Sequence, residues 1–508
     1  MPILNSIVSW LNIKRLYQIE LFKKYPIEVQ EETFNKLIKK AKDTEWGVKY
    51  HYKTIQSVEQ FKNRVPIQDY EKIKPYVTRL RQGEQNLLWP TDIKWFAKSS
   101  GTTADKSKFI PVSKEAIEDC HFRGGKDIIA IYTQNNPETG ILSGKGLALG
   151  GAHQVNNFSN ESYYGDVSAI LIQNLPFWAE FIRTPNLSIA LMSEWEEKLE
   201  KMSEATVNEN VTNIAGVPSW MLVLLKNILE KTGKTNILDI WPNLEVFIHG
   251  GVSFLPYREH FKQIIKSDKM NYLETYNASE GFFSIQDDPT TDDMLLMLDY
   301  GIFYEFIAME NIDKPHPKTL MLDEVEIGKN YAMLITTNAG LWRYLIGDTV
   351  KFTSKYPFKI KITGRTKHYI NVFGEELIID NAESAIKVAC EKTHAMVREY
   401  TAAPIFMNQD EAGGHEWLFE FEKAPESLDY FADVLDNALK AVNSDYEAKR
   451  YKNMALKLPK LTSLKYGVFY TWLKEKQKLG GQHKIPRLSN SRDYVEQLLD
   501  INSKMKND

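Results

Sequence analysis

Residues 96–112 combine hydrogen-bond donors with positive charge in a pattern that suits a phosphate-rich ligand. The set comprises four hydroxyl side chains, one glycine and one lysine: Ser99, Ser100, Gly101, Thr102, Thr103 and Lys108. Each hydroxyl can donate a hydrogen bond, the glycine lets backbone amides turn toward an anion, and the lysine adds a point charge. We therefore predict a triphosphate-binding loop, with a solvated turn as the alternative.

This loop differs from the P-loop of kinases and GTPases. Its spacing does not match Gly-x-x-x-x-Gly-Lys-Ser/Thr. Residues 108–112, Lys-Phe-Ile-Pro-Val, favour a strand where a P-loop would begin a helix. A kinase-like or GTPase-like phosphate site is therefore disfavoured.

A pair of glycines, Gly250 and Gly251, comes after His249 and the predicted strand 244–248. Two glycines at the carboxyl end of a strand could let a flat ring lie against the backbone. We predict a nucleotide contact there, and an ordinary turn is the alternative.

Tyr276, Ser279 and Glu280 follow the next predicted strand, 271–275, and offer an aromatic face, a hydroxyl and a carboxylate. Mg²⁺ usually binds through one or two carboxylates together with phosphate oxygens and water. Glu280 is therefore a candidate magnesium ligand, and a surface carboxylate is the alternative.

Asp348 follows a glycine at the predicted end of a strand, where a carboxylate can accept hydrogen bonds from both hydroxyls of a ribose. Arg343 stands between Trp342 and Tyr344, and burying a guanidinium is costly unless it meets an anion. A structural Arg–Asp pair within this stretch is the alternative to a ligand contact.

Lys484 lies in a glycine-containing segment near the carboxyl end of the chain. Gly480 and Gly481 free the loop and Pro486 limits its conformations, so the segment could present the lysine as a mobile cation. A solvated lysine is the ordinary alternative.

The elements that must hold these groups alternate between helices and strands. Apolar periodicity predicts two packed helices within residues 1–45 and further helices at 195–205, 219–231 and 381–392. Strand patterns occur at 244–248, 271–275 and 301–307. Pro66 and Pro75 predict helix ends. We expect an α/β fold with a domain boundary near residue 365.

Composition excludes several classes of partner. A formal net charge of -4 and a pI near 6.3 give no electrostatic footprint for nucleic acid. The apolar runs fall far short of the roughly 18 residues that suggest a bilayer span. Two cysteines, Cys120 and Cys390, without metal-type spacing fit a reducing compartment. We expect a cytoplasmic protein with no nucleic-acid or membrane partner.

Taken together, five ordered motifs resemble the adenylate-forming, firefly-luciferase-like superfamily. Within it, the chain is similar to the Gretchen Hagen auxin-responsive family of acyl acid amido synthetases, as a bacterial-type member. The motifs are Ser-Ser-Gly-Thr-Thr at 99–103 with Lys108, Tyr-x-x-Ser-Glu at 276–280, Trp-Arg-Tyr-x-x-Gly-Asp at 342–348, Thr-Gly-Arg at 363–365 and Lys-x-Pro-Arg at 484–487. The similarity covers nearly the whole chain.

The resemblance implies a large N-terminal domain of β-sheets flanked by helices, residues 1–364, and a small mobile α+β C-terminal domain, residues 365–508. It also implies an ATP-dependent ligase with two steps. A small carboxylic acid first attacks the α-phosphate of ATP, giving an acyl adenylate and pyrophosphate. The amine of an amino acid then displaces AMP.

Site roles follow by position from the same resemblance. Residues 99–103 and Lys108 would hold the phosphates, Tyr276 would stack on or flank the adenine, Glu280 would hold Mg²⁺ and Asp348 would bind the ribose. Arg365 and Lys367 lie where the superfamily has its ribose or phosphate contact and its hinge. Lys484 would bridge the attacking carboxylate and the α-phosphate, where two anions otherwise repel each other.

The chain also departs from the family pattern. Asp105 replaces a glycine common at the loop tip, and an auxin or jasmonate substrate does not follow from the motifs. We expect residues 120–220 to line the acyl pocket, with Phe122, Tyr164 and Trp178 as candidates and core packing as their alternative. Whether a general base exists is left open.

Two other functions stay open. An acyl-CoA ligase would share the adenylation step, although the sequence shows no clear coenzyme A site. A nucleotide-binding protein without catalysis is disfavoured by the presence of both Glu280 and Lys484.

Overall fold

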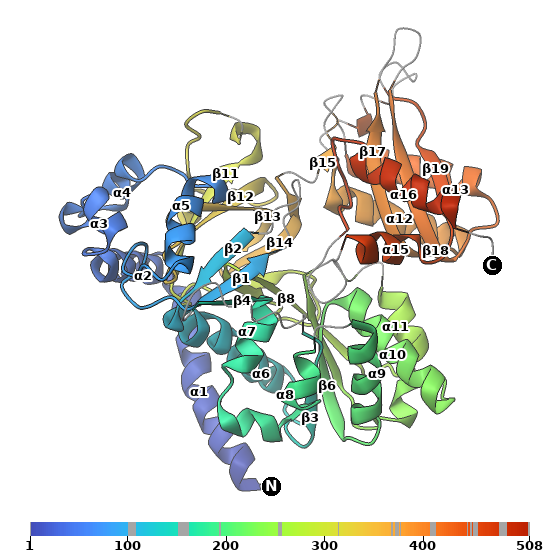
Figure 1. Ribbon diagram of the computed structural model, residues 1–508, viewed down its shortest axis with the longest axis horizontal. Coiled ribbons are helices and arrows are strands. Elements are labelled where there is room, and N and C mark those ends of the chain that lie inside the picture. Colours follow the sequence, from blue (N-terminus) through green and yellow to red (C-terminus); the bar gives the residue numbers. More distant parts are fainter. Residues whose placement is uncertain are drawn as a thin grey trace.

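The computed structural model describes most of the 508-residue chain (Figure 1). The described residues are 2–99, 108–150, 162–192, 195–251, 254, 257–312, 314–366, 369–370, 375, 377–406, 413–443, 446–447, 450, 456–476 and 485–505. Of the predicted site residues, Ser100, Gly101, Thr102, Thr103, Lys367 and Lys484 lie outside this set. No helix in the described ranges is long and apolar enough to cross a membrane.

The N-terminal segment confirms the prediction of two packed helices. They are α1 (Pro2–Lys24) and α2 (Pro26–Ala41). α2 begins with Pro26, whose fixed φ suits a first turn. It buries one face, including Phe34 and Leu37. Short helices follow: α3 (Glu45–Lys49), η1 (Tyr52–Thr54), α4 (Val58–Arg64) and α5 (Tyr70–Arg81).

Helix α5 shows that the expected helix end at Pro75 is wrong. Asp69 caps the helix by accepting a hydrogen bond from the Lys72 N–H, and the helix continues through Pro75 to Arg81. Tyr70, Ile73, Val77 and Leu80 form one buried face. A proline inside a helix costs about 3 kcal/mol, and burial of this apolar face outweighs that cost.

A small sheet flanks the hydroxyl-rich loop. Its strands are β1 (Trp95–Ser99), β2 (Lys108–Val112) and β4 (Tyr163–Gly165), in the order β2-β1-β4. The strand predicted at 108–112 is confirmed. β1 and β2 run antiparallel with Ser99 opposite Lys108, so the two ends of the loop lie side by side.

Among the described residues, eleven strands form the main sheet, in the order β11-β12-β13-β14-β10-β9-β8-β7-β6-β3-β5. Their bounds are β3 (Lys145–Ala148), β5 (Arg183–Thr184), β6 (Val211–Gly216), β7 (Val246–Gly250), β8 (Asn271–Ala278), β9 (Gly281–Ile285), β10 (Met294–Leu296), β11 (Ile302–Ala308), β12 (Asn330–Thr337), β13 (Tyr344–Lys355) and β14 (Phe358–Arg365). The pairs from β5 to β8 are parallel and the pairs beyond β8 are antiparallel. Because β7 and β8 are parallel neighbours, their carboxyl ends meet at one edge of the sheet.

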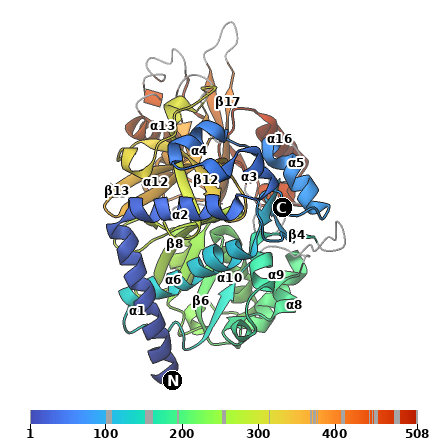
Figure 2. The same ribbon diagram turned by 90° about the vertical axis from the view of Figure 1, so that its left-hand side faces the viewer.

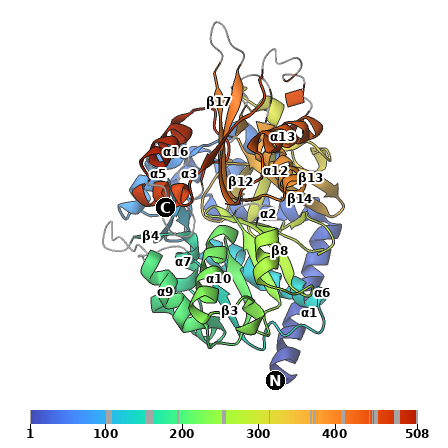
Figure 3. The same ribbon diagram turned by 90° about the vertical axis from the view of Figure 1, so that its right-hand side faces the viewer.

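Helices cover the main sheet from more than one side. Figure 2 shows α1 and α2 in front, and Figure 3 shows α9 and α10 from the opposite direction. The helical segments of this part are η2 (Ala116–His121), α6 (Phe122–Asn135), α7 (Val167–Gln173), η3 (Phe177–Phe181), α8 (Leu187–Ala190), α9 (Trp195–Thr206), α10 (Pro218–Thr232), η4 (Ile237–Asp239), α11 (Arg258–Ile264), η5 (Met309–Asn311) and η6 (Leu322–Glu324). The helices predicted at 195–205 and 219–231 are therefore confirmed.

The C-terminal part forms a smaller α+β lobe (Figure 1). Its elements are β15 (Tyr369–Ile370), β16 (Leu377–Ile378), α12 (Ile379–Thr393), β17 (Met396–Ile405), β18 (Gly414–Lys423), α13 (Leu428–Val442), β19 (Lys460–Leu464), α15 (Val468–Glu475) and α16 (Asp493–Lys504). Trp417, Phe419 and Phe431 belong to its own buried core. The expected α/β architecture, with a large N-terminal and a smaller C-terminal domain, is confirmed. The boundary at residues 364 and 365, directly at the end of β14, stays a prediction.

Candidate active site

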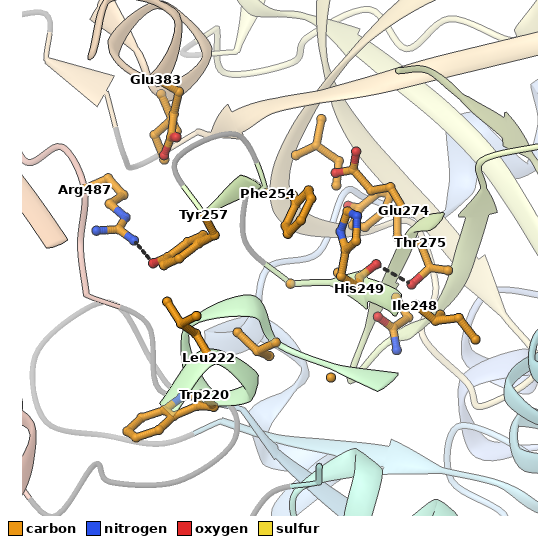
Figure 4. A pocket seen from close by; sticks show the side chains of 18 of the residues that line it. Trp220, Leu222, Ile248, His249, Phe254, Tyr257, Glu274, Thr275, Glu383 and Arg487 are labelled. Atoms are coloured by element: carbon orange, nitrogen blue, oxygen red, sulfur yellow. Dashed lines mark hydrogen bonds between the residues drawn. The ribbon is translucent and has the colours of Figure 1, made fainter. Parts of the chain in front are cut away.

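A cavity of about 570 Å³ lies between the two domains (Figure 4). The predicted site residues that line it are Gly250, Gly251, Tyr276, Ser279, Glu280 and Asp348. These residues come from three separate stretches of the large domain, at the ends of β7 and β8 and within β13. The small domain provides the opposite wall with α12, β17, β18, α15 and residues 485–487.

A hydrogen bond joins two of the predicted nucleotide-binding residues. The Tyr276 hydroxyl donates to Asp348 Oδ2 over 2.8 Å, and both side chains are buried. The bond fixes the direction of the carboxylate at the cavity edge, beside the backbone pair of Asp348 with Arg365. The arrangement suits a carboxylate that accepts hydrogen bonds from a ribose. Stacking of Tyr276 on adenine stays a prediction.

The two glycines serve a tight contact between neighbouring strands. A Cβ atom at Gly250 would lie 2.4 Å from the Thr275 carbonyl oxygen, which no side chain could tolerate. Gly251 has φ 82°, a conformation that favours glycine. The glycines therefore let the ends of β7 and β8 come together at the cavity, and the residue types at both positions have a structural cause.

Ser279 and Glu280 form the two-residue turn between β8 and β9, because Ala278 pairs with Gly281. Both turn residues line the cavity, with Ser279 buried and Glu280 half-buried. In the described part of the chain, no three His, Cys, Asp or Glu side chains converge as a metal cluster. A magnesium ion at Glu280 would therefore take its other ligands from phosphate oxygens and water, as Mg²⁺ usually does in proteins.

For the other predicted phosphate ligands, the described part of the structure does not show a contact with the cavity. Ser99 ends β1, and Arg365 ends β14, but their side chains lie outside the described parts. Lys108 begins β2 with Nζ 5.8 Å from the centroid of the Tyr70 ring, and it is not among the described residues that line the cavity. Its role at the phosphates stays a prediction.

Arg343 is a structural residue, and its partner is Glu305, which is neither the ligand anion considered from the sequence nor the Asp348 of the alternative Arg–Asp pair. Its guanidinium bonds both oxygens of Glu305, at 3.0 Å and 2.9 Å, and it also donates to backbone carbonyls of Lys62 and Val65. Arg343 and Glu305 are both buried outside the cavity. The costly burial of the guanidinium is therefore offset by a protein carboxylate rather than by a ligand.

The apolar part of the cavity uses residues that sequence reasoning missed. Region 120–220 does contribute to its lining, through Ile128, Leu149, Val167 and Trp220 among others. The named candidates Phe122, Tyr164 and Trp178 are not among the described lining residues, and Trp178 is 57% exposed. Apolar residues of a helix carry no sequence signal that separates a cavity wall from ordinary core.

His249 contributes an uncharged surface to the cavity. Its ring lies against that of Phe254 (Figure 4), and the two stack with their centroids 4.2 Å apart. Burial lowers the pKa of His249 to about 3, so the imidazole is neutral at physiological pH. It therefore adds a neutral ring, and no positive charge, to this wall.

A second polar network, on the small-domain side, was also missed. Arg487 donates to Glu399 Oε2 over 2.5 Å and to the Tyr257 hydroxyl over 3.1 Å, so the arm after residue 484 contacts both domains. Tyr400 donates to Glu383 Oε1 over 3.0 Å. Arg487 belongs to the Lys-x-Pro-Arg motif at 484–487. Glu383 and Glu399 lie within a helix and a strand, where no local sequence pattern distinguishes them.

Three models of one protein family match this chain. The GH3 family N-terminal domain matches residues 15–270, the GH3 family central domain residues 295–365 and the GH3 family C-terminal domain residues 380–493. The indole-3-acetic acid-amido synthetase GH3.3 of Arabidopsis thaliana is 22% identical, covering 98% of this chain and 95% of its own. The jasmonoyl--L-amino acid synthetase JAR4 of Nicotiana attenuata is 24% identical, covering 92% of each chain.

A solved structure extends the likeness to the fold. The GH3.15 acyl acid amido synthetase superposes with a TM-score of 0.78 at 17% identity, covering 96% of this chain and 95% of its own. The likeness supports the arrangement of a large N-terminal and a smaller C-terminal domain in an adenylate-forming fold. Since the match to the N-terminal domain alone covers half of the chain, the protein belongs to the GH3 family.

Proposed function

We propose that the interdomain cavity binds ATP against its large-domain wall and that the chain joins a small carboxylic acid to the amine of an amino acid there. Membership of the GH3 family assigns the chain to AMP-forming acyl acid amido ligases, and ATP is therefore one of its substrates. The hydrogen bond from Tyr276 to Asp348 is the observation that supports the cavity as the nucleotide site.

The nucleotide would lie along the edge where β7, β8 and β13 present their polar groups. Asp348 would accept hydrogen bonds from the ribose, and Tyr276 would hold that carboxylate while flanking the base. Residues 99–103 and Lys108 would contact the phosphates, with Arg365 or Lys367 nearby. Mg²⁺ bound beside Glu280 would neutralise part of the phosphate charge.

In the first step, a carboxylate oxygen attacks the α-phosphorus, and the bond from phosphorus to the pyrophosphate oxygen breaks. Lys484 would bridge the two anions that approach each other, which lowers their repulsion in the transition state. In the second step, the amine nitrogen attacks the acyl carbon and AMP leaves with the electron pair of the broken bond. Rotation of the small domain about residues 365–367 would remove Lys484 between the steps.

Exchange of labelled pyrophosphate into ATP across a panel of small carboxylic acids tests this function. At least one acid should support exchange, and adding a mixture of amino acids should then yield an amide and AMP. Measurable ATP binding without exchange for any acid would favour a nucleotide-binding protein without catalysis. Formation of a thioester with coenzyme A, in place of an amide, would assign an acyl-CoA ligase.

Two finer features belong to the same proposal. We propose a bacterial-type member of the family, because the chain is only 22% and 24% identical to the two plant enzymes compared above. A reducing, cytoplasmic setting is supported by Cys120 and Cys390, which are both free thiols.

A further inference from the structure

The small-domain wall of the cavity is rich in carboxylates. Five of them line it: Asp380, Glu383, Glu399, Glu420 and Glu422. Four meet a cation or backbone amides: Asp380 with Lys351, Glu399 with Arg487, Glu420 with the N–H groups of Gly467 and Phe469, and Glu422 with Lys226. The negative charge of each of these four carboxylates is therefore stabilised by groups of the protein itself.

Glu383 is different. Its side chain is buried, and Oε1 accepts the hydrogen bond from the Tyr400 hydroxyl over 3.0 Å. Its Oε2 is also buried and has no hydrogen-bond partner among the described residues. A buried carboxylate oxygen without a partner is costly, and native proteins usually satisfy such atoms. A cationic group at this position would supply the missing partner.

Glu383 stands close to the end of the sheet that carries Asp348. It lies one turn into α12, which packs against β14. A Cβ atom at Gly364 would lie 3.5 Å from Ile379 Cβ, and Lys351 Nζ lies 3.5 Å from Asp380 Oδ2. Figure 4 shows Glu383 pointing from α12 toward Tyr257 and Arg487. The carboxylate thus faces the same cavity as the nucleotide wall, from the opposite side.

Burial raises the pKa of Glu383 to about 7, so the carboxyl group changes its charge near neutral pH. Arg487 and the hydrogen bond from Tyr400 lower that pKa, whereas Glu399 and Asp380 raise it. Tyr257, from the large domain, faces the same cluster. A group whose pKa lies near the working pH is well matched to proton transfer.

We propose that Glu383 is a catalytic residue of the second step: Oε2 binds the ammonium group of the acceptor amino acid and takes a proton from it. The inference rests on the proposed function. An amino acid in water carries an ammonium group, which has no lone pair for attack. Transfer of one proton to Glu383 leaves a neutral amine. The nitrogen then forms the bond to the acyl carbon, AMP departs with the electron pair of the acyl–oxygen bond, and the second ammonium proton leaves with the products.

A comparison of two acceptors tests the proposal in the variant Glu383→Gln. The acyl adenylate is formed from the acid that supports pyrophosphate exchange, and either a mixture of the twenty amino acids or hydroxylamine is added. Hydroxylamine is largely uncharged at neutral pH and needs no base before attack. Because general bases contribute roughly 10²–10⁴-fold, amide formation should fall by about 10²-fold or more, while hydroxamate formation changes less than about threefold.

The pH profile gives an independent readout. In the parent protein, amide formation should fall as the pH drops below about 7, because Glu383 takes up its proton. In Glu383→Gln, amide formation should not show this fall at low pH. Tyr400→Phe removes a hydrogen bond that lowers the pKa of Glu383, so the fall should move to higher pH. This second variant decides the matter if Glu383→Gln does not fold.

Another carboxylate of the small-domain wall supplies the control. Glu422→Gln, on the same wall, should keep the parent ratio of amide to hydroxamate formation. Pyrophosphate exchange shows whether adenylation survives in Glu383→Gln. If it does, an equal loss of amide and hydroxamate formation would overturn the role of Glu383. Full retention of amide formation would overturn it as well. Absence of exchange in the parent protein would instead overturn the proposed function and, with it, this inference.

Discussion

The two walls of the cavity are built from different kinds of element. On the large domain, polar groups stand at strand ends and in the turn between β8 and β9, whereas Asp348 lies within β13. On the small domain, Glu383 lies within a helix, Glu399 within a strand and Arg487 on an irregular segment. Local sequence patterns reveal polar turns that follow strands. They do not reveal a helix or strand side chain that becomes important only when two domains meet.

The largest effect on stability is expected for the ion pair of Arg343 with Glu305, which lies outside both walls of the cavity. Arg343→Met leaves Glu305 buried without its cationic partner, which should lower the free energy of unfolding by about 3–5 kcal/mol. Denaturant titration measures this loss. The double variant Arg343→Met/Glu305→Leu should recover most of it, and a recovery of less than half would show that the cost has another cause.

On the small-domain side, Lys484→Ala should suppress acid-dependent pyrophosphate exchange far more than ATP binding. Loss of one preorganised electrostatic contact to a transition state typically costs roughly 10²–10³-fold in rate. Exchange kinetics together with calorimetric titration of ATP separate the two quantities. An equal loss of exchange and of ATP affinity would count against the assigned role.

On the large-domain side, Asp348→Asn should weaken ATP binding before any chemistry occurs. Hydrogen bonds to charged groups contribute about 1.5–3 kcal/mol, so the Kd for ATP should rise roughly tenfold to a hundredfold. The ratio of amide to hydroxamate formation at saturating ATP should stay at the parent value. A shift in that ratio would mean that the two walls do not act separately.

The smallest effect is expected for Tyr276→Phe, which removes only the hydroxyl that orients Asp348. The hydroxyl acts on ATP only through the carboxylate that it orients, so the Kd for ATP should rise less than in Asp348→Asn, by about tenfold at most. In the double variant with Asp348→Asn the two losses should not add, because they share one contact. Additive losses, measured by the same titration, would show that the hydroxyl acts independently of Asp348.

The sequence predicted the large-domain wall more completely than the small-domain wall. Apolar periodicity correctly indicated α2, α10 and α12, because each helix buries one face. The helix end expected from Pro75 is wrong because a buried face outweighs the proline, and Trp178, a candidate for the acyl pocket, is exposed. Glu383 gave no signal at all, since a glutamate in an amphipathic helix is ordinary until its neighbours across the fold remove it from water.

A crystal structure of the protein with AMP would test the central claim most directly, namely that one interdomain cavity holds the nucleotide. The account predicts the ribose hydroxyls within hydrogen-bond distance of Asp348 and the base beside Tyr276 and Gly250. Nucleotide bound elsewhere, without contact to Asp348 or Tyr276, would contradict it.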